Sequence, residues 1–305
     1  MTVMPLIQSL CALSTPGQVL VSEPMRLHTT FRVGGPADVF FTPRTEAELS
    51  GAVMAARHEG VPMTVVGNGS NLLVRDGGIR GLVICLGESF SGISVDGTLL
   101  TARAGDLLSC AARAALNAGL TGLEFAGGIP GSVGGGMVMN AGAYGGQLSD
   151  VAESLRVMDV QTGEISEMPA SAMNYGYRTS AVLTNGGVVT LARLRLSSGD
   201  PAEIRSRMDD LNTRRREKQP LTQPSAGSTF KRPEGYFAGA LIEGAGLKGT
   251  SVGGAMVSPK HAGFIVNTGN ASAADILALI ALVQARVFEK DGVMLEPEVR
   301  ILGED

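Results

Sequence analysis

The sequence has 305 residues, of which 44% are hydrophobic and 18% are charged, and its formal net charge is −4. A chain of this length can bury one large or two modest cores, and its charge gives no basic field for nucleic acid or an acidic membrane. Cys11, Cys85 and Cys110 stand far apart without Cys-x-x-Cys spacing, which argues against a disulfide framework or a zinc site and for a reducing compartment.

Hydrophobic periodicity predicts short strands and two helices after an N-terminal extension over residues 1–24. Thr45 and Glu48 form the pattern of a capping box, so a helix is expected to begin there. Asp96-Gly97 between two apolar runs is a strong signal for a type I′ hairpin. The elements expected in this part are strands 39–41, 63–66 and 82–86, a helix over 45–59, the hairpin strands 93–95 and 99–102, and a helix over 106–117.

The rest of the chain contains a further hairpin, a charged helix and a long apolar helix. Pro220 and Pro224 stop the charged helix, and Ser272 with Asp275 opens the apolar one. The expected elements are the hairpin strands 155–160 and 164–168, a strand over 188–196, a helix over 201–218, a strand over 264–266, a helix over 272–290 and a strand over 298–302. Hairpins outnumber strand–helix–strand alternations, which predicts an α+β fold with a domain boundary near residue 200.

The N-terminal stretch 1–17 has no basic residue ahead of its apolar part, so it is not typical of a secretory signal. The longest uncharged apolar helical segment, 276–283, is too short to cross a bilayer. Three histidines without a pair at metal-ligand spacing give no reason to expect a bound transition metal. We therefore expect a soluble cytoplasmic protein without a membrane, nucleic-acid or metal partner.

The stretch from Glu124 to Gly146 holds nine of the 42 glycines and almost no charge. It interleaves these glycines with apolar residues, so it is built to be buried, unlike a polar Gly/Ser linker. A buried glycine loop presents N–H groups to which phosphate oxygens or a cofactor ring can bind. A tight interior turn pair without a ligand explains this stretch equally well when it is considered alone.

A second donor-rich loop, Gly67-Asn-Gly-Ser-Asn-Leu-Leu73, follows an apolar strand. It is neither a G-x-G-x-x-G fingerprint nor a phosphate-binding G-x-x-x-x-G-K-[ST] loop, and an Asn-Gly hairpin turn is the more common explanation for such a sequence. Two loops of this kind, far apart in the chain, nevertheless suggest one long phosphate-bearing ligand held at two points. A dinucleotide has the appropriate size.

Polar residues concentrate in 175–180, 225–233 and 295–300. Ser228, followed by Lys231 and Arg232, has the surroundings of a nucleophile or an acid whose alkoxide is stabilised by cations. It is not part of a G-x-S-x-G elbow, because Phe230 stands where the second glycine is required. Each of these residues, considered singly, has a simpler explanation: Ser228 as an N-cap or turn serine, Arg178 as part of a surface ion pair, and Glu298 as an exposed strand charge.

Together and in this order, the motifs resemble the UDP-N-acetylenolpyruvoylglucosamine reductase family, flavoenzymes that complete UDP-N-acetylmuramate for bacterial peptidoglycan. Each motif is weak alone, but the ordered set is highly specific and extends over almost the whole chain from residue 26. The matching stretches are 29–38, 67–73, 127–135, Tyr177-Arg178, 226–233, Gly253-Gly254 and 295–300.

The resemblance implies a two-lobed FAD-binding domain of the vanillyl-alcohol-oxidase type over 25–199, with lobes over roughly 25–90 and 91–199. A C-terminal α+β substrate domain over 200–305 follows. The implied partners are non-covalently bound FAD, NADPH as co-substrate, and an enolpyruvyl ether of a UDP-sugar as substrate, in the shorter subclass of the family. The cofactor-binding residues implied are Gly67, Asn68, Gly69, Ser70, Asn71, Leu72, Gly127, Gly128, Ile129, Pro130, Gly131, Ser132, Gly134 and Gly135.

Arg178, Ser228 and Glu298 fall on the family's catalytic positions. The resemblance implies that Arg178 stabilises charge at the substrate carboxylate and that Ser228 donates a proton. Glu298 has to carry a proton or act through a water molecule, because a bare carboxylate would repel the developing charge. Lys218, Lys231, Arg232 and His261 are further candidates for lining the substrate site.

Two alternatives remain open at this point. An FAD oxidase of the same fold, acting on an alcohol or lactone, would use the glycine loops but would be reoxidised by oxygen. A nucleotide-binding module without activity would need the glycine loops but not Arg178, Ser228 and Glu298.

Overall fold

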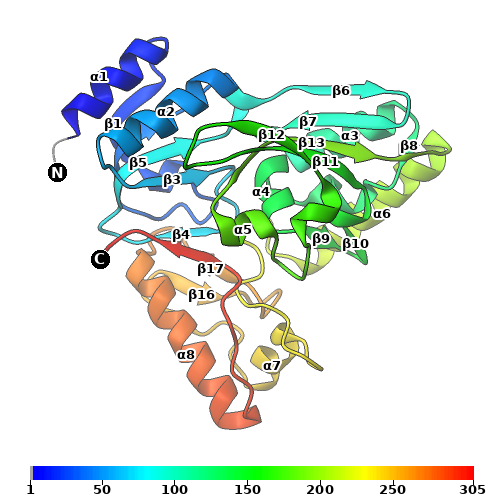
Figure 1. Cartoon of the computed structure of the whole chain (residues 1–305). Helices are drawn as coiled ribbons and strands as arrows, with labels where there is room; N and C mark the ends of the chain where they lie inside the picture. The colour runs from blue at the N-terminus through cyan, green and yellow to red at the C-terminus, as the bar shows by residue number, and fades with distance from the viewer. Residues whose placement is uncertain (1–2) are drawn as a thin grey trace. The chain divides into compact units, whose positions relative to one another are not determined.

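The structure is a computed structural model that describes residues 3–305. The chain packs into two compact units, each built from several segments. The first unit comprises the chain up to residue 21 together with 38–68 and 81–214, and the second comprises 22–37, 69–80 and 215–305. Both units combine small sheets with separate helices, which confirms the predicted α+β class (Figure 1).

The predicted domain boundary near residue 200 stays a prediction, because the compact units follow packing and divide the chain at other points. The segment 1–24 was expected to be an extension ahead of the organised fold, but most of its described residues form regular structure. It contains α1 (Met4–Leu13) and β1 (Val19–Pro24). Leu6 and Leu10 of α1 are fully buried, so this helix contributes to the core of the first unit.

A four-stranded sheet has the order β1-β2-β5-β3, with β2 over Pro36–Phe41, β3 over Met63–Val66 and β5 over Ile79–Cys85. Strand β3 has the predicted bounds and pairs in parallel with β5, from Met63 opposite Leu82 to Val66 opposite Cys85. The helix α2 (Glu46–His58) lies beside α1, and the Thr45 side chain accepts a hydrogen bond from the Glu48 N–H at 3.1 Å. The predicted helix start is thereby confirmed, but the reciprocal half of the capping box is absent, because the Glu48 carboxylate accepts from Arg44 N at 2.8 Å instead of from Thr45 N.

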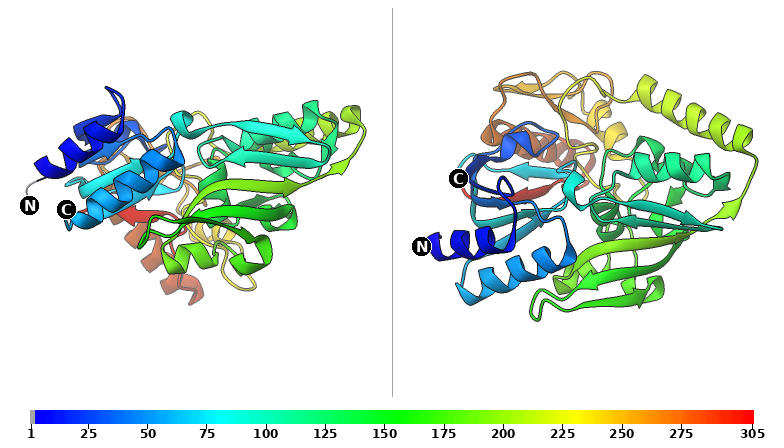
Figure 2. Two further views of the ribbon diagram at one scale, coloured as in Figure 1. Left: turned by 45° about the horizontal axis from the view of Figure 1, so that its top comes forward. Right: turned by 90° about the horizontal axis from the view of Figure 1, so that it is seen from above.

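A five-stranded antiparallel sheet forms the larger part of the first unit, in the order β12-β11-β13-β7-β6. Its side-by-side strands are visible in Figure 2, and α3 and α4 pack against it. Both predicted hairpins are confirmed as its antiparallel pairs, but the predicted type I′ turn at Asp96-Gly97 is wrong. Asp96 pairs with Leu99, so the turn residues are Gly97 and Thr98, and only Gly97 has a positive φ. The bounds are β6 (Ile93–Asp96), β7 (Leu99–Arg103), β11 (Ala152–Met158), β12 (Ile165–Pro169), β13 (Val188–Arg195), α3 (Leu108–Asn117) and α4 (Val133–Val138).

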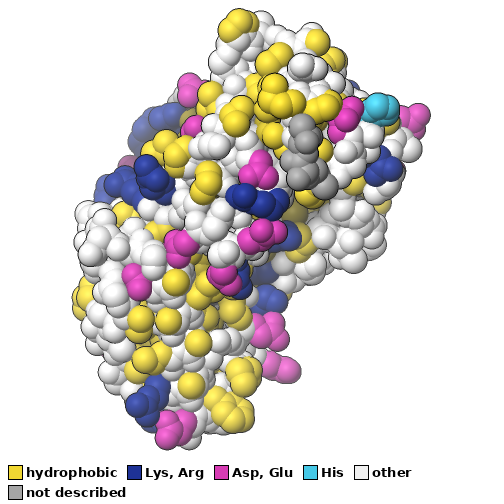
Figure 3. All heavy atoms as spheres, turned by 90° about the vertical axis from the view of Figure 1, so that its left-hand side faces the viewer, with side chains coloured by type: hydrophobic (Ala, Val, Ile, Leu, Met, Phe, Trp, Pro, Cys, Tyr) yellow, Lys and Arg dark blue, Asp and Glu magenta, His cyan; other side chains and the backbone are white. Residues whose placement is uncertain are grey.

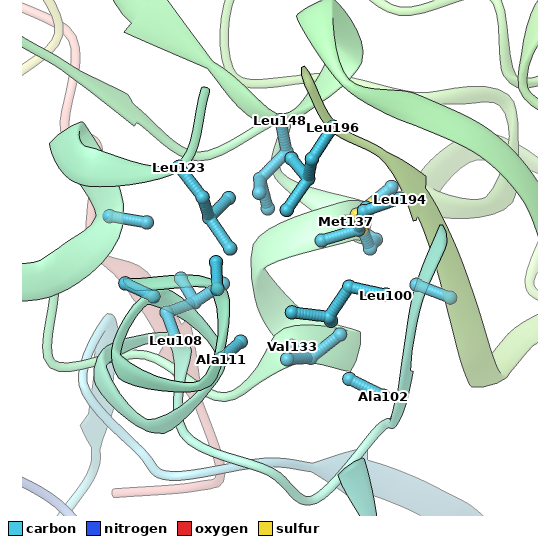
Figure 4. Packing of buried hydrophobic residues seen from close by; sticks show 14 of the residues in the cluster. Leu100, Ala102, Leu108, Ala111, Leu123, Val133, Met137, Leu148, Leu194 and Leu196 are labelled. Atoms are coloured by element: carbon cyan, nitrogen blue, oxygen red, sulfur yellow. The ribbon is translucent and has the colours of Figure 1, made fainter. Parts of the chain in front are cut away.

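The core under this sheet is made by apolar side chains that point toward one another from both helices and from the strands (Figure 4). Leu108 of α3, Val133 and Met137 of α4 and Leu194 of β13 are all fully buried. The smaller elements of this part are η2 (Glu88–Phe90), η3 (Glu124–Gly128), η4 (Leu148–Asp150), η5 (Ala170–Met173), α5 (Ala181–Asn185), and the strand pairs β8 (Leu120–Thr121) with β14 (Ser197–Ser198) and β9 (Gly142–Ala143) with β10 (Gly146–Gln147). The charged helix α6 runs over Pro201–Lys218, as predicted.

The second unit is organised around α8 (Ala273–Asp291), whose capping box between Ser272 and Asp275 confirms the predicted start. This helix packs against the antiparallel sheet β15-β16-β17. A separate parallel pair joins β4 to β18, with Leu72 opposite Arg300. The bounds are η1 (Met25–Leu27), β4 (Leu72–Val74), α7 (Ala238–Gly244), β15 (Ser251–Val252), β16 (Ala255–Val257), β17 (Ile265–Asn267) and β18 (Arg300–Leu302).

No helix between residues 3 and 305 combines the length and the apolar character that crossing a bilayer requires. On the face shown in Figure 3, basic and acidic side chains are intermixed and are not segregated by sign.

The glycine-rich stretch 124–146 is not simply a pair of buried turns, because it also contains η3 and the six-residue helix α4. The Gly134 N–H donates to the Ala104 carbonyl at 2.9 Å. A Cβ atom added at Gly134 would lie 2.7 Å from the Ala104 Cβ, which is closer than such atoms approach. The adjacent Gly135 is exposed, and an added Cβ there would meet Ser132 Oγ at an ordinary 3.4 Å.

Alanine substitutions at these two neighbouring glycines are therefore expected to have opposite effects on the stability of the apoprotein. Gly134→Ala overpacks the contact with Ala104 and should lower the free energy of unfolding by about 1–3 kcal/mol. Gly135→Ala gains helix propensity and should leave stability unchanged or raise it by up to about 1 kcal/mol. Urea titrations followed by circular dichroism measure both values, and equal losses would contradict the close approach at Gly134.

Candidate active site

In the first unit, the structure brings the start of one predicted glycine loop against the other. A Cβ added at Gly67 would lie 2.2 Å from Ser132 Oγ. The Asn68 side chain donates from Nδ2 to the Pro130 carbonyl at 2.5 Å. The hairpin alternative for Gly67–Leu73 is excluded, because β3 pairs with β5 and β4 pairs with β18. Two segments 62 residues apart in sequence thus form one local structure.

Where these two loops meet, several backbone N–H groups make no hydrogen bond to the described residues. Within residues 3–305, the N–H groups of Asn68, Gly131 and Ser132 have no hydrogen-bond acceptor. The carbonyls of the same loop are used: Gly131 O accepts from Leu108 N at 3.0 Å, and Ser132 O accepts from Gly136 N at 2.8 Å. Unused donors clustered on a glycine loop fit an anionic group such as a pyrophosphate.

The rest of the 67–73 loop, from Gly69 onward, belongs to the second unit. Gly69 and Asn71 make contacts there that stabilise the protein's own backbone. Gly69 has φ +63°, and a Cβ there would lie 1.9 Å from the His28 carbonyl oxygen, so the protein's own backbone requires this glycine. Asn71 donates from Nδ2 to the Glu298 carbonyl at 3.1 Å, and its own carbonyl accepts from Arg300 N at 2.9 Å. Asn71 therefore fixes the segment that carries Glu298, while Leu72 begins β4.

Arg178 lies in the first unit, in a tight turn after η5. Its guanidinium is half-buried, donates from Nη2 to the Gly142 carbonyl at 3.4 Å, and lies 5.1 Å from the Tyr177 ring centroid. The backbone of Arg178 has φ +56°, a conformation that glycine and asparagine adopt far more readily. Left-handed residues of this kind concentrate at functional sites, because surrounding contacts are needed to hold them.

Tyr175, at the start of the same turn, has a buried hydroxyl without a hydrogen-bond partner among the described residues. Burial raises the pKa of this phenol well above its ordinary value, so it is protonated at neutral pH. Buried hydroxyls are rarely left unpaired in native proteins. The free donor of Tyr175 is therefore a second position in this unit where a ligand atom fits.

In the second unit, main-chain pairing places Ser228 and Glu298 on neighbouring segments. Glu298 N donates to the Thr229 carbonyl at 2.8 Å, and Phe230 is bridged to Pro297. Thr229 is fully buried, and Thr229 N donates to the Gly263 carbonyl at 2.8 Å. Ser228 is exposed and Glu298 is half-buried. Ser228 is not an N-cap, which removes one of the simpler explanations for it.

The basic side chains expected beside Ser228 are used in different ways. Lys231 is paired with Glu296 at 3.0 Å, so its charge is compensated. The Arg232 guanidinium lies 4.0 Å from the centroid of the Phe237 ring. Lys218 is exposed at the end of α6. Of these three, Lys231 and Arg232 share the segment of Ser228 and Thr229.

His261 is a neutral imidazole held by the loop that pairs with Thr229. Its Nδ1 accepts from Gly263 N at 3.1 Å, which places the ring proton on Nε2. Burial lowers the pKa of His261, and the positive charge of Lys248 lowers it further. At neutral pH, His261 can therefore donate a hydrogen bond through Nε2 but does not supply a positive charge.

Two residues of the site were not singled out as functional from the sequence. One is Tyr175, which lies in the polar segment 175–180 but was given no role of its own. The other is Asn140, which is buried and has φ +44°. The available signal for Asn140 was its position as the one amide side chain in an apolar glycine-rich stretch.

The lowered pKa of His261 has a consequence for stability as a function of pH. Below about pH 6.5, the unfolded chain takes up a proton before the folded chain does, so stability is lost as the pH falls toward the folded pKa. His261→Asn keeps an acceptor near the Gly263 N–H but does not titrate. The stability difference between wild type and variant should shrink from pH 7.5 to pH 5. Urea titrations at both pH values measure it, with His58→Asn correcting for loss of an exposed histidine, and a constant difference would contradict the shift.

Comparison with known proteins places these features in a family. Residues 37–168 match the profile of an FAD binding domain, and residues 219–302 match that of the UDP-N-acetylenolpyruvoylglucosamine reductase C-terminal domain. The UDP-N-acetylenolpyruvoylglucosamine reductase of Clostridioides difficile (strain 630) is 52% identical over 287 residues, which cover 94% of each chain.

The crystal structure of UDP-N-acetylenolpyruvylglucosamine reductase from Thermus caldophilus has a TM-score of 0.79 at 38% identity, covering 93% of this chain and 98% of that one. A variant of Phl p 4, a glucose oxidase, has a TM-score of 0.50 at 15% identity over 65% of this chain and 44% of its own, and it shares the fold alone. These findings confirm the predicted FAD-binding fold of the vanillyl-alcohol-oxidase type, and FAD as the cofactor. The chain belongs to the UDP-N-acetylenolpyruvoylglucosamine reductase family.

Proposed function

We propose that this protein reduces the enolpyruvyl ether of UDP-N-acetylglucosamine to UDP-N-acetylmuramate, with NADPH as the reductant. Family membership supports the reaction. The observation that carries the assignment of residues is the pairing of Thr229 with Glu298, which sets the exposed Ser228 hydroxyl and the Glu298 carboxyl on adjacent segments. A proton donor and a second acid are what addition of hydrogen across a polarised double bond requires.

The unused N–H groups of Asn68, Gly131 and Ser132 would hold the cofactor by its pyrophosphate. Bound FAD, once reduced by NADPH, supplies a hydride to the methylene carbon of the enolpyruvyl group. Gly135 is exposed on α4, next to this loop, so it leaves room for a flat ring system near the phosphates. Tyr175 offers a buried hydroxyl that a polar atom of a ligand can pair with.

Arg178 would bind the carboxylate that is attached to the reacting double bond. When hydride adds to the methylene carbon, negative charge grows on the adjacent carbon and spreads into that carboxylate. A fixed guanidinium stabilises this charge more than it stabilises the ground state, and such an interaction lowers the barrier. The strained turn keeps the guanidinium fixed, so little reorganisation is needed when the charge appears.

Ser228 would then deliver the proton to the carbon on which negative charge has grown. A hydroxyl is a sufficient acid here, because such a carbanion is far more basic than a serine alkoxide. Glu298 would assist as the acid form or through a water molecule. Lys231 and Arg232 follow Ser228 in the same segment, and with Lys218 and the Nε2–H of His261 they are candidates for holding the diphosphate.

The alternative of an FAD oxidase on this fold is less well supported. An alcohol or lactone substrate carries no carboxylate or diphosphate, so it gives no role to Arg178 or to the basic residues of the 228–232 segment. A nucleotide-binding module without activity gives no role to Ser228 or Glu298.

A double titration of the purified protein separates these three functions. The protein should be yellow, should bleach when NADPH is added under anaerobic conditions, and should regain its colour rapidly with the enolpyruvyl UDP-sugar and slowly with air. Bleaching with NADPH would rule out the module without activity. Faster recovery with air than with the UDP-sugar would identify an oxidase.

Ser228→Ala is expected to affect only the second half-reaction. The variant should bind FAD and be reduced by NADPH at a near-normal rate, since Ser228 acts after the flavin has lost its hydride. Reoxidation by the enolpyruvyl substrate should slow by about 10²–10⁴-fold, the usual effect of losing a positioned general acid. Stopped-flow absorbance at the flavin band measures both steps.

Ser251→Ala is the matched control for this variant. Ser251 is an exposed serine of the same unit whose hydroxyl donates to the Gly249 carbonyl at 3.3 Å. It should leave both half-reactions unchanged. If Ser228→Ala slows both steps equally, or slows neither, the proton-donor role is wrong.

A further inference from the structure

The turn that carries Arg178 is a closed four-residue structure with a strained member. Gly176 N donates to the Thr179 carbonyl at 3.2 Å, and Thr179 N donates to the Gly176 carbonyl at 3.4 Å. Arg178 occupies the third position, where turns with a positive φ normally have glycine or asparagine. A left-handed residue of another type costs about 1–3 kcal/mol and persists only where neighbouring contacts determine it.

Two buried side chains attach this turn to the C-terminal end of α4 and to the residue Asn140 beyond it. Asn140 donates from Nδ2 to the Gly176 carbonyl at 3.2 Å, and Ser180 donates from Oγ to the Val138 carbonyl at 2.7 Å. Asn140 is 3% exposed and Ser180 is 2% exposed. The turn is thus held at its first residue, Gly176, and at Ser180, the residue that follows it, by groups that water does not reach.

Further hydrogen bonds determine which way the side-chain amide of Asn140 is turned. Its Oδ1 accepts from Ser149 N at 3.0 Å, and its Nδ2 also donates to Gln147 Oε1 at 3.2 Å. Because Oδ1 has to face an N–H donor, Nδ2 has to face the Gly176 carbonyl. The side chain therefore links three segments, of which one carries the proposed catalytic arginine.

The backbone of Asn140 alone does not require an asparagine. Its φ of +44° closes α4, and glycine is the residue that most readily adopts such a conformation after a helix. The side chain is the added feature, and it is directed at the Arg178 turn. We propose that Asn140 is a positioning residue for Arg178: it holds the strained turn so that the guanidinium is fixed for the developing negative charge. This inference rests on the proposed role of Arg178.

The experiment compares Asn140→Gly and Asn140→Asp with a control at Asn174, all as FAD-loaded protein. Both Asn140 variants tolerate the left-handed backbone, and Asn140→Asp is isosteric but cannot donate to Gly176 O. Asn174 lies in the same region with φ +45° but is exposed and makes no side-chain hydrogen bond within the described chain, so Asn174→Gly changes one left-handed asparagine without loosening the turn.

The Asn140 variants should be reduced by NADPH at the normal rate, and their reoxidation by the enolpyruvyl substrate should slow by about 10- to 100-fold, as expected for a displaced catalytic group. Hydrogen exchange at the Thr179 amide should become faster in the same variants, because its acceptor is no longer fixed. Asn174→Gly should change neither measurement. If the exchange rate or the reoxidation rate of both Asn140 variants stays normal, the positioning role is overturned.

A double-mutant cycle with Arg178→Ala distinguishes positioning from a general structural effect. If Asn140 acts through Arg178, then Asn140→Asp should add no further slowing in the Arg178→Ala background. Additive slowing would overturn the inference and leave the role of Arg178 intact. If Arg178→Ala alone is reoxidised at the normal rate, the proposed role of Arg178 fails, and the positioning role fails with it.

Discussion

The close packing of α4 against the backbone at Ala104 positions both ends of the site in the first unit. This contact is possible because position 134 has no side chain. At its N-terminal end, the helix begins next to Ser132, which lies against Gly67. At its C-terminal end, Val138 and Asn140 bind the turn that carries Arg178. One six-residue helix is thus the common support for the proposed phosphate-binding loop and for the turn of Arg178.

In the second unit, Thr229 has a comparable supporting role for Ser228 and Glu298. Its main chain bonds to Gly263 and to Glu298, and its hydroxyl accepts from Ile265 N at 3.1 Å. The positive charge around Ser228 is smaller than the number of basic residues there suggests. Lys231 has a carboxylate partner, and His261 is neutral because of burial. Recognition of a diphosphate here would therefore depend on directed N–H donors as much as on net positive charge.

Local patterns predicted β3, α2, α6 and α8 well, because each has its own caps or periodicity. They did not predict α4, since three of its six residues are glycine and its stability comes from packing on Ala104. The parallel pairing of β4 with β18 joins residues far apart in sequence, which local signals cannot report. The proposed catalytic residues came from the family resemblance. The role of Asn140 was missed for the same reason as the pairing of β18: its partner, Gly176, is 36 residues away.

The left-handed backbone of Arg178 also bears on how this protein can fail in a cell. Arginine and glycine codons differ by a single base, so Arg178→Gly is an accessible mutation. Glycine relieves the backbone strain, and the resulting chain would be folded as firmly as the parent or more so. Cellular quality control recognises unfolded chains and not missing guanidinium groups. If Arg178 has the proposed role, such an allele would persist at normal abundance with little or no turnover.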